Sequence, residues 1–129
     1  MKTTVVIGAS ENPERYSNRA VRMLRKHNHH VIAIGNKEGR ISGIGNDTLG
    51  FDSVRIQTGF PKIENVDTVT MYVGEKNQPP YYDYILSLKP KRVIFNPGAE
   101  NPEFEKIVRD AEIEVLEACT LVMLSVGNY

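Results

Sequence analysis

The sequence predicts an α/β fold, a Rossmann-like doubly wound domain whose mainly parallel five-stranded sheet carries helices on both faces. Two observations lead to this expectation. Short unbroken apolar runs such as residues 4–7 and 31–34 are typical of strands buried on both sides of a parallel sheet. These runs alternate with segments of helical period through short connections, as right-handed crossovers require. The length of 129 residues suits one domain, so we expect residues 1–129 to form a single unit.

The individual elements follow from the same patterns. Strands are expected at residues 4–7, 31–34, 69–73, 93–95 and 113–116, the last being the most polar and therefore an edge strand. Helices are expected to begin at a Ser17 cap, near Gln78, at an Asn101 cap followed by Pro102, and at Thr120. Residues 36–66 carry five glycines and no helical period. We expect a short hairpin near residues 41–44 or a loop there, in place of a crossover helix.

Composition narrows the classes of partner and compartment. The 16 Lys and Arg residues balance 16 Asp and Glu residues, so no overall field would attract nucleic acid or an acidic membrane. The start of the chain runs directly into a strand pattern without a signal peptide, and no apolar stretch approaches the ~18 residues that cross a bilayer. The single cysteine excludes an internal disulfide and suits a reducing compartment. We therefore expect a cytoplasmic protein.

Ligands of doubly wound sheets bind beyond the carboxyl ends of the strands, where the strand order reverses. This rule directs attention to four loops, at residues 8–17, 35–39, 74–79 and 96–101. An anionic ligand would have to be bound by a local arrangement in these loops, because the net charge is zero.

The first of these loops has the features of a phosphate-binding turn. Gly8 permits a sharp turn without a Cβ clash, and the small residues Ala9 and Ser10 let backbone N–H groups approach phosphate oxygens. Arg15 and Arg19 can reach a diphosphate. The alternative is an ordinary strand-to-helix loop, but glycine combined with two basic residues is more than a turn requires.

The second loop discriminates between nucleotide cofactors. The dinucleotide fingerprint G-x-G-x-x-G is absent, since Ser10 occupies the second glycine position and Pro13 the third. Strand 31–34 ends in Gly35-Asn36-Lys37 with no acid for the 2′-hydroxyl of an NAD ribose, and Glu38 comes too late. Lys37 instead offers a cation. Both departures favour a ligand with a phosphorylated ribose, either NADP or coenzyme A.

Together, these motifs resemble the small single-domain CoA-binding proteins, which are relatives of the amino-terminal domain of the succinyl-CoA synthetase α-subunit. The resemblance covers nearly the whole chain in order and spacing. It rests on Gly8-Ala9-Ser10, Asn12-Pro13, Arg15-Tyr16, Asn36, Val66-Asp67, Tyr72-Val73-Gly74 and Asn96-Pro97-Gly98-Ala99-Glu100-Asn101. The chain departs from the family at Gly74, where relatives often carry proline. It also has no counterpart of the synthetase domain that carries the phosphorylated histidine.

The resemblance implies a position for each part of the cofactor. The CoA diphosphate would lie on residues 8–10, a nucleotide phosphate would meet Lys37, and residues 72–74 and 96–98 would line the nucleotide and pantetheine channel. The cofactor-binding residues expected on this basis are Gly8, Ala9, Ser10, Asn12, Arg15, Tyr16, Asn36, Lys37, Tyr72, Val73, Gly74, Asn96, Pro97 and Gly98.

The reactive side chains do not assemble into catalytic machinery. His27, His29 and His30 fall between the first helix and the second strand, at the far end of the sheet, where a structural role is expected rather than metal binding. Cys119 is either a small core residue or a thiol near a bound pantetheine arm. No Ser/His/Asp, Cys/His or paired-carboxylate set can be built, so we predict no catalytic and no metal-binding residues.

The leading hypothesis is accordingly a binding module for coenzyme A or an acyl-CoA without chemistry of its own. The alternatives are an NADP-binding oxidoreductase domain, the CoA-binding subunit of a split acyl-CoA ligase, and a regulatory subunit that responds to acyl-CoA. The missing fingerprint disfavours nicotinamide cofactors, and the lack of a second domain disfavours a complete ligase. A protein partner or a homo-oligomer is possible, whereas nucleic acid and membrane are not expected partners.

Overall fold

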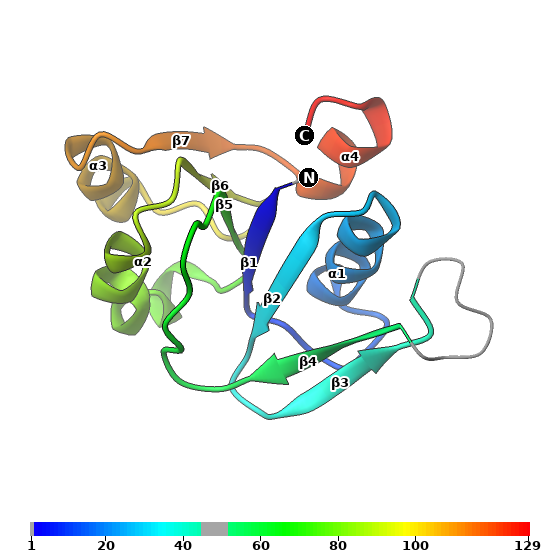
Figure 1. Ribbon diagram of the computed structural model, residues 1–129. Helices are drawn as coiled ribbons and strands as arrows, with labels where there is room; N and C mark the ends of the chain where they lie inside the picture. The colour runs from blue at the N-terminus through cyan, green and yellow to red at the C-terminus, as the bar shows by residue number, and fades with distance from the viewer. Residues whose placement is uncertain (1, 45–51) are drawn as a thin grey trace.

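The computed structural model describes residues 2–44 and 52–129. Its centre is a seven-stranded sheet with the order β3-β4-β2-β1-β5-β6-β7 (Figure 1). The strands are β1 (Thr3–Ile7), β2 (His30–Ile34), β3 (Gly39–Ser42), β4 (Ser53–Gln57), β5 (Thr68–Met71), β6 (Arg92–Phe95) and β7 (Glu114–Glu117). The helices are α1 (Tyr16–Lys26), α2 (Tyr82–Leu88), α3 (Pro102–Asp110) and α4 (Thr120–Val126), with 3-10 turns η1 (Glu75–Asn77) and η2 (Pro79–Tyr81).

The prediction of five strands was wrong in number, because the stretch 36–66 contributes β3 and β4. The strand β4 lies parallel to β2, and β3 lies antiparallel to β4. Alternation in β4 explains why the pattern was missed: Val54 and Ile56 are buried while Arg55 between them is exposed. A half-buried strand of this kind has no unbroken apolar run. The other pairings are parallel, and the polar strand β7 lies at an edge as predicted.

Helices cover both faces of the sheet, as the sequence indicated (Figure 1). On one face α1 and α4 lie side by side, and Leu24 and Leu124 pack there against β-strand residues and the β3–β4 hairpin. On the other face, Ile85 of α2 and Phe104 of α3 join the largest buried cluster. The chain moves outward from β1 through β2, then returns to β5 on the other side of β1. The strand order therefore reverses at β1, which places the expected ligand site at its carboxyl end.

The starts of α3 and α4 agree with the sequence, whereas those of α1 and α2 differ, α1 being capped at Arg15 instead of Ser17. The α3 cap is confirmed, since Asn101 Oδ1 accepts a hydrogen bond from the Phe104 N–H at 3.1 Å. The closing helix α4 is also as expected. The helix expected from Gln78 begins later, at Tyr82, because Pro79 and Pro80 supply no N–H groups and form a 3-10 turn first.

Candidate nucleotide-binding site

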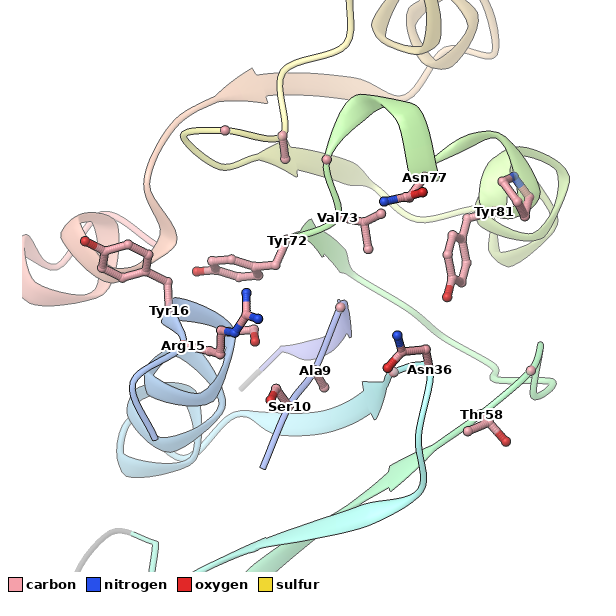
Figure 2. A pocket seen from close by; sticks show the side chains of 18 of the residues that line it. Ala9, Ser10, Arg15, Tyr16, Asn36, Thr58, Tyr72, Val73, Asn77 and Tyr81 are labelled. Carbon is pink, nitrogen blue, oxygen red and sulfur yellow. The ribbon is translucent and has the colours of Figure 1, made fainter. Parts of the chain in front are cut away.

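A cavity of about 950 Å³ opens at the carboxyl ends of the central strands (Figure 2). Its volume lies at the upper end of the ~300–1,000 Å³ typical of ligand sites. All predicted site residues except Asn12, Lys37 and Asn96 line it, namely Gly8, Ala9, Ser10, Arg15, Tyr16, Asn36, Tyr72, Val73, Gly74, Pro97 and Gly98. Four further lining residues, Ser17, Gly35, Asn77 and Ala99, belong to the predicted loops but were not named as site residues. The sequence did not identify Thr58, Gly59, Phe60, Pro80 and Tyr81.

The turn after β1 is packed tightly between the two neighbouring loops. Gly8 has a φ of +100°, and a Cβ there would lie 3.0 Å from the backbone carbonyl carbon of Tyr72. The N–H groups of Gly8 and Ala9 both donate to the Ile34 carbonyl, at 2.8 and 2.9 Å. Gly35 approaches from the other side, where a Cβ would lie only 2.4 Å from the Ala9 carbonyl oxygen. Glycine is therefore required at both positions to hold the turn in place.

A buried asparagine fixes the end of this turn. Asn18 lies in the first turn of α1 with its side chain fully buried, and its Nδ2 donates to the Ser10 carbonyl at 2.8 Å. Its Oδ1 accepts from Arg22 Nε at 2.8 Å. Within the turn, the Asn12 N–H donates to Ser10 Oγ at 3.1 Å. Asn12 thus shapes the turn from outside the cavity.

The amino terminus of α1 faces the cavity with its positive end uncompensated. The N-cap is Arg15 rather than the expected Ser17, no side chain caps the helix, and its first turn contains no acid. By contrast, α3 is capped by Asn101 and carries Glu103 and Glu105 in its first turn. Among the described residues, those that line the cavity include no Asp or Glu and one Lys or Arg, which is Arg15. A cation such as Arg15 at the positive end of a helix is unfavourable, and an anion bound between the cation and the helix end would remove this repulsion.

The β4 side of the cavity is aromatic. Phe60, 57% exposed, lies with its ring centroid 5.7 Å from that of Tyr81 and 5.4 Å from that of Tyr84. The Tyr84 hydroxyl donates to the Pro61 carbonyl at 2.6 Å and so holds this loop, and burial raises the pKa of Tyr84 to about 12. An exposed ring supported from behind offers a surface on which a flat heterocycle can stack.

The opposite wall is held by one fully buried amide. Gln78 Nε2 donates to the carbonyls of Val73 and Ala99, at 2.8 and 2.7 Å, and its Oε1 accepts from Asn101 Nδ2 at 3.0 Å. Both carbonyls belong to cavity-lining residues in the loops that follow β5 and β6. Gln78 therefore fixes the distance between these two loops, although it does not line the cavity itself.

Asn96 occupies a similar position beneath the cavity. Its Nδ2 donates to Thr70 Oγ1 and the Met71 carbonyl, at 2.7 and 2.8 Å, and its Oδ1 accepts from the Thr120 N–H at 2.9 Å. Close by, the Tyr72 hydroxyl is buried and, among the described residues, has no hydrogen-bond partner. Burial raises the pKa of Tyr72 well above its ordinary value. Asn96 is thus occupied by protein groups, while Tyr72 lines the cavity.

The other reactive side chains lie away from the cavity. The histidines are at the amino-terminal edge of the sheet as predicted, where His29 packs against Lys2 and Tyr129. Cys119 is a half-buried free thiol just before α4 and does not line the cavity. Residues 2–44 and 52–129 contain no cluster of three or more His, Cys, Asp or Glu side chains that could hold a metal ion. No helix in this part of the chain has the length and apolarity needed to span a membrane.

The sequence of residues 2–125 matches the family described as the CoA binding domain. The chain belongs to this CoA-binding domain family. Among solved structures, an uncharacterised protein is 46% identical, with a TM-score of 0.89 and coverage of 100% of this chain and 98% of that one. The structure of cell-free ID.343 from Thermus thermophilus is 23% identical, with a TM-score of 0.76 and coverage of 99% and 90%.

A more distant likeness concerns the fold alone. Aspartate semialdehyde dehydrogenase II from Vibrio cholerae is 14% identical, with a TM-score of 0.58, and the match covers 98% of this chain but 45% of that one. No curated protein matched the sequence.

Proposed function

We propose that this CoA-binding domain holds coenzyme A, or an acyl-CoA, in the cavity beyond β1 and acts as a binding module. The observation that carries the proposal is the uncompensated amino terminus of α1, where Arg15 faces a cavity whose described lining contains no carboxylate. The Gly8 and Ala9 N–H groups are already bonded to the Ile34 carbonyl, so the diphosphate would bind the N–H groups of Ser10 and of the first turn of α1. Family membership makes coenzyme A the leading candidate among diphosphate-bearing nucleotides.

The residues present fit the remaining parts of the cofactor. The exposed ring of Phe60, backed by Tyr81 and Tyr84, suits the adenine ring. The Tyr72 ring lines the cavity on the side toward Tyr16 (Figure 2), where it offers an apolar surface against which a pantetheine arm can pack. The cavity is large enough for a nucleotide with a long arm.

Ligand discrimination tests the proposal directly. Coenzyme A should raise the melting temperature of the purified protein more than ADP, ATP, NAD or NADP at the same concentration. A ligand that binds only the folded state adds about 2.7 kcal/mol of stability at one hundred times its dissociation constant. Equal shifts for coenzyme A and ADP would mean that only the nucleotide diphosphate is recognised. A larger shift with NADP would replace the proposal by a nicotinamide-binding function.

Arg15→Gln should weaken coenzyme A by roughly 10- to 100-fold, as expected for the loss of one charge-assisted hydrogen bond to phosphate. The unfolding midpoint of the free protein should stay the same or rise, because the change removes a cation from the positive end of α1. The control is Arg19→Gln, one turn further along, where the guanidinium lies 5.4 Å from the Tyr16 ring and outside the cavity lining. Calorimetric titrations that show equal losses in the two variants would argue against diphosphate binding at this helix end.

Lys37 supports a separate test of the ribose phosphate. Its neighbour Asn36 lines the cavity, whereas Lys37 itself is exposed outside the lining. If its side chain pairs with the 3′-phosphate in the complex, Lys37→Ala should weaken coenzyme A by roughly tenfold or more and leave dephospho-CoA nearly unchanged. Calorimetry with both ligands measures the difference. Equal losses of affinity for the two ligands would mean that Lys37 acts through the overall electrostatic potential of the site and not on the 3′-phosphate.

A further inference from the structure

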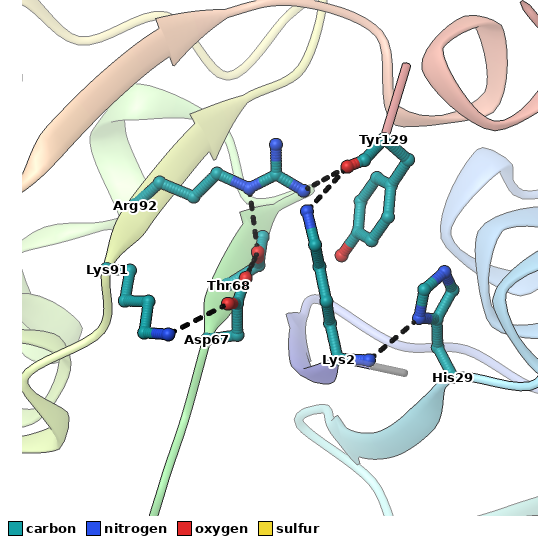
Figure 3. A network of polar contacts seen from close by, with 7 residues as sticks. All are labelled: Lys2, His29, Asp67, Thr68, Lys91, Arg92 and Tyr129. Atoms are coloured by element: carbon teal, nitrogen blue, oxygen red, sulfur yellow. Dashed lines mark hydrogen bonds and ion pairs between the residues drawn. The ribbon is translucent and has the colours of Figure 1, made fainter. Parts of the chain in front are cut away.

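The end of the chain is held at the amino-terminal edge of the sheet, opposite the cavity, by contacts to each part of Tyr129 (Figure 3). Its carbonyl oxygen accepts from Lys2 Nζ at 2.6 Å and from Arg92 Nη2 at 3.2 Å. Its hydroxyl forms a hydrogen bond with the Thr4 hydroxyl. Its ring centroid lies 4.5 Å from the Arg92 guanidinium carbon and 5.0 Å from the centroid of the His29 ring.

His29 makes this arrangement dependent on its protonation state. Its Nδ1 accepts a hydrogen bond from the backbone N–H of Lys2 at 3.0 Å. An imidazolium carries hydrogens on both nitrogens, so protonation would replace this acceptor by a donor that faces another donor. Lys2 would lose its backbone contact, and the same residue supplies the ammonium group that holds the Tyr129 carbonyl.

The charges around the ring also oppose protonation. Burial has the largest effect in lowering the pKa of His29, and the positive charges of Lys2, His27 and Arg92 lower it further. The Arg25 guanidinium binds the His29 carbonyl at 2.9 Å. The acids nearby have cationic partners of their own, with Asp67 3.9 Å from Lys91 Nζ and Asp52 3.5 Å from Arg25 Nη2. A second cation at His29 would therefore be poorly compensated.

We propose that His29 is a pH-sensitive latch, which holds residues 127–129 against the sheet when it is neutral and releases them when it is protonated. The proposal is independent of the nucleotide site. The released segment directly follows α4, whose first residue, Thr120, stays anchored through Asn96 and Thr70. The latch therefore frees the segment after the helix, while the first residue of the helix stays attached beneath the cavity.

The direction with pH follows from linkage. Because the folded pKa of His29 lies below 6.5, the latched state binds fewer protons than the released state. The latch is fully closed above pH 6.5 and weakens as the pH falls from 6.5 toward the folded pKa. One proton taken up on release changes the opening equilibrium by up to about tenfold per pH unit in this window.

NMR of the full chain with labelled histidine, threonine and tyrosine tests the latch between pH 8 and pH 5. Tyr129 is identified by the signal missing from the Tyr129→Phe spectrum. As His29 protonates, the contact between the Tyr129 and Thr4 side chains should disappear, and the Tyr129 shifts should approach those of an unstructured peptide. Amide signals of the sheet should persist, which separates release from global unfolding. A Tyr129–Thr4 contact that survives at pH 5 with His29 protonated would overturn the proposal.

Two variants separate the latch from other effects of acid. His29→Asn keeps an acceptor oxygen near the position of Nδ1 and cannot be protonated, so Tyr129 should stay attached at pH 5. His27→Asn is the matched control, since His27 is exposed and contacts only the Met23 carbonyl among the contacts described. This variant should still release the segment, at the same pH as the unmodified protein or slightly above it, because it removes one of the lesser positive charges that lower the pKa of His29. Release of residues 127–129 at the same pH in His29→Asn would assign the effect to another group and refute the latch. If His29→Asn is detached at every pH, the titration of the unmodified chain decides the question.

Discussion

Gln78→Glu should lower the free energy of unfolding by roughly 3–5 kcal/mol at pH 8, although it changes a single side-chain group. The amide at this position donates to two carbonyl oxygens, those of Val73 and Ala99, in a site with no solvent exposure. A carboxylate of the same shape would present oxygen to both carbonyls. Two hydrogen bonds would be lost, and both carbonyl oxygens would be left without a donor. The buried negative charge would also be repelled by these oxygens.

The same substitution should become less harmful in acid. Burial and the two carbonyls would raise the pKa of the introduced carboxyl group above its unfolded value of about 4.3. The folded state therefore binds the proton more tightly, and the penalty is smallest below that pH and grows as the pH rises through the folded pKa. Urea unfolding followed by circular dichroism at pH 5 and pH 8 measures this trend.

A neighbouring residue provides the control for this substitution. Asn77→Asp places the same new charge one residue earlier, on an exposed side chain that lines the cavity. Its unfolding free energy should change by less than about 0.5 kcal/mol, as is usual for surface substitutions. A cost below about 1 kcal/mol for Gln78→Glu would show that the two loops do not depend on this amide.

The sequence predicted the parts of the fold in which local pattern and tertiary environment agree. The apolar runs of β1, β2, β5 and β6 are buried on both faces, so their pattern does not depend on the neighbours. The Gly8 turn was identified for a similar reason, because a glycine that ends such a strand is a local signal. Its positive φ and its packing against Tyr72 bear out that requirement.

The parts that the sequence missed depend on contacts between distant segments. The aromatic wall at Phe60 follows β4, a strand whose alternating pattern was not recognised, so the loop after it was not counted among the loops that form the site. Gln78 was taken as the start of a helix, and only the fold shows that two separate loops offer carbonyls to its amide. The start of α1 at Arg15 rather than Ser17 runs against capping preference. Such an exception is expected where a binding site, rather than stability, selects the residue.

Gly35→Ala should destabilise the protein by roughly 1–3 kcal/mol and weaken coenzyme A by about tenfold or more. Gly35 lacks the positive φ that makes a side chain costly at Gly8, so the effect would come from contact alone. The added methyl group would lie 2.4 Å from the Ala9 carbonyl oxygen and 3.1 Å from Ile56 Cγ2. A contact this short with a backbone atom can be relieved only if the backbone moves. The segment displaced would be the Ala9–Ser10 turn, which is proposed to bind the diphosphate.

Gly74→Ala tests whether this contact, rather than the loss of any cavity glycine, is responsible. Gly74 also lines the cavity and has an ordinary φ of −63°, and a Cβ there would meet no atom within 4 Å. Replacing glycine by alanine at such a position restricts the unfolded chain and typically adds about 0.4–1 kcal/mol of stability. The two alanine variants should therefore move the unfolding midpoint in opposite directions. Equal shifts of the same sign, with unchanged binding of coenzyme A in Gly35→Ala, would mean that the loops after β1 and β2 can separate without cost, and the tight packing would not explain the site.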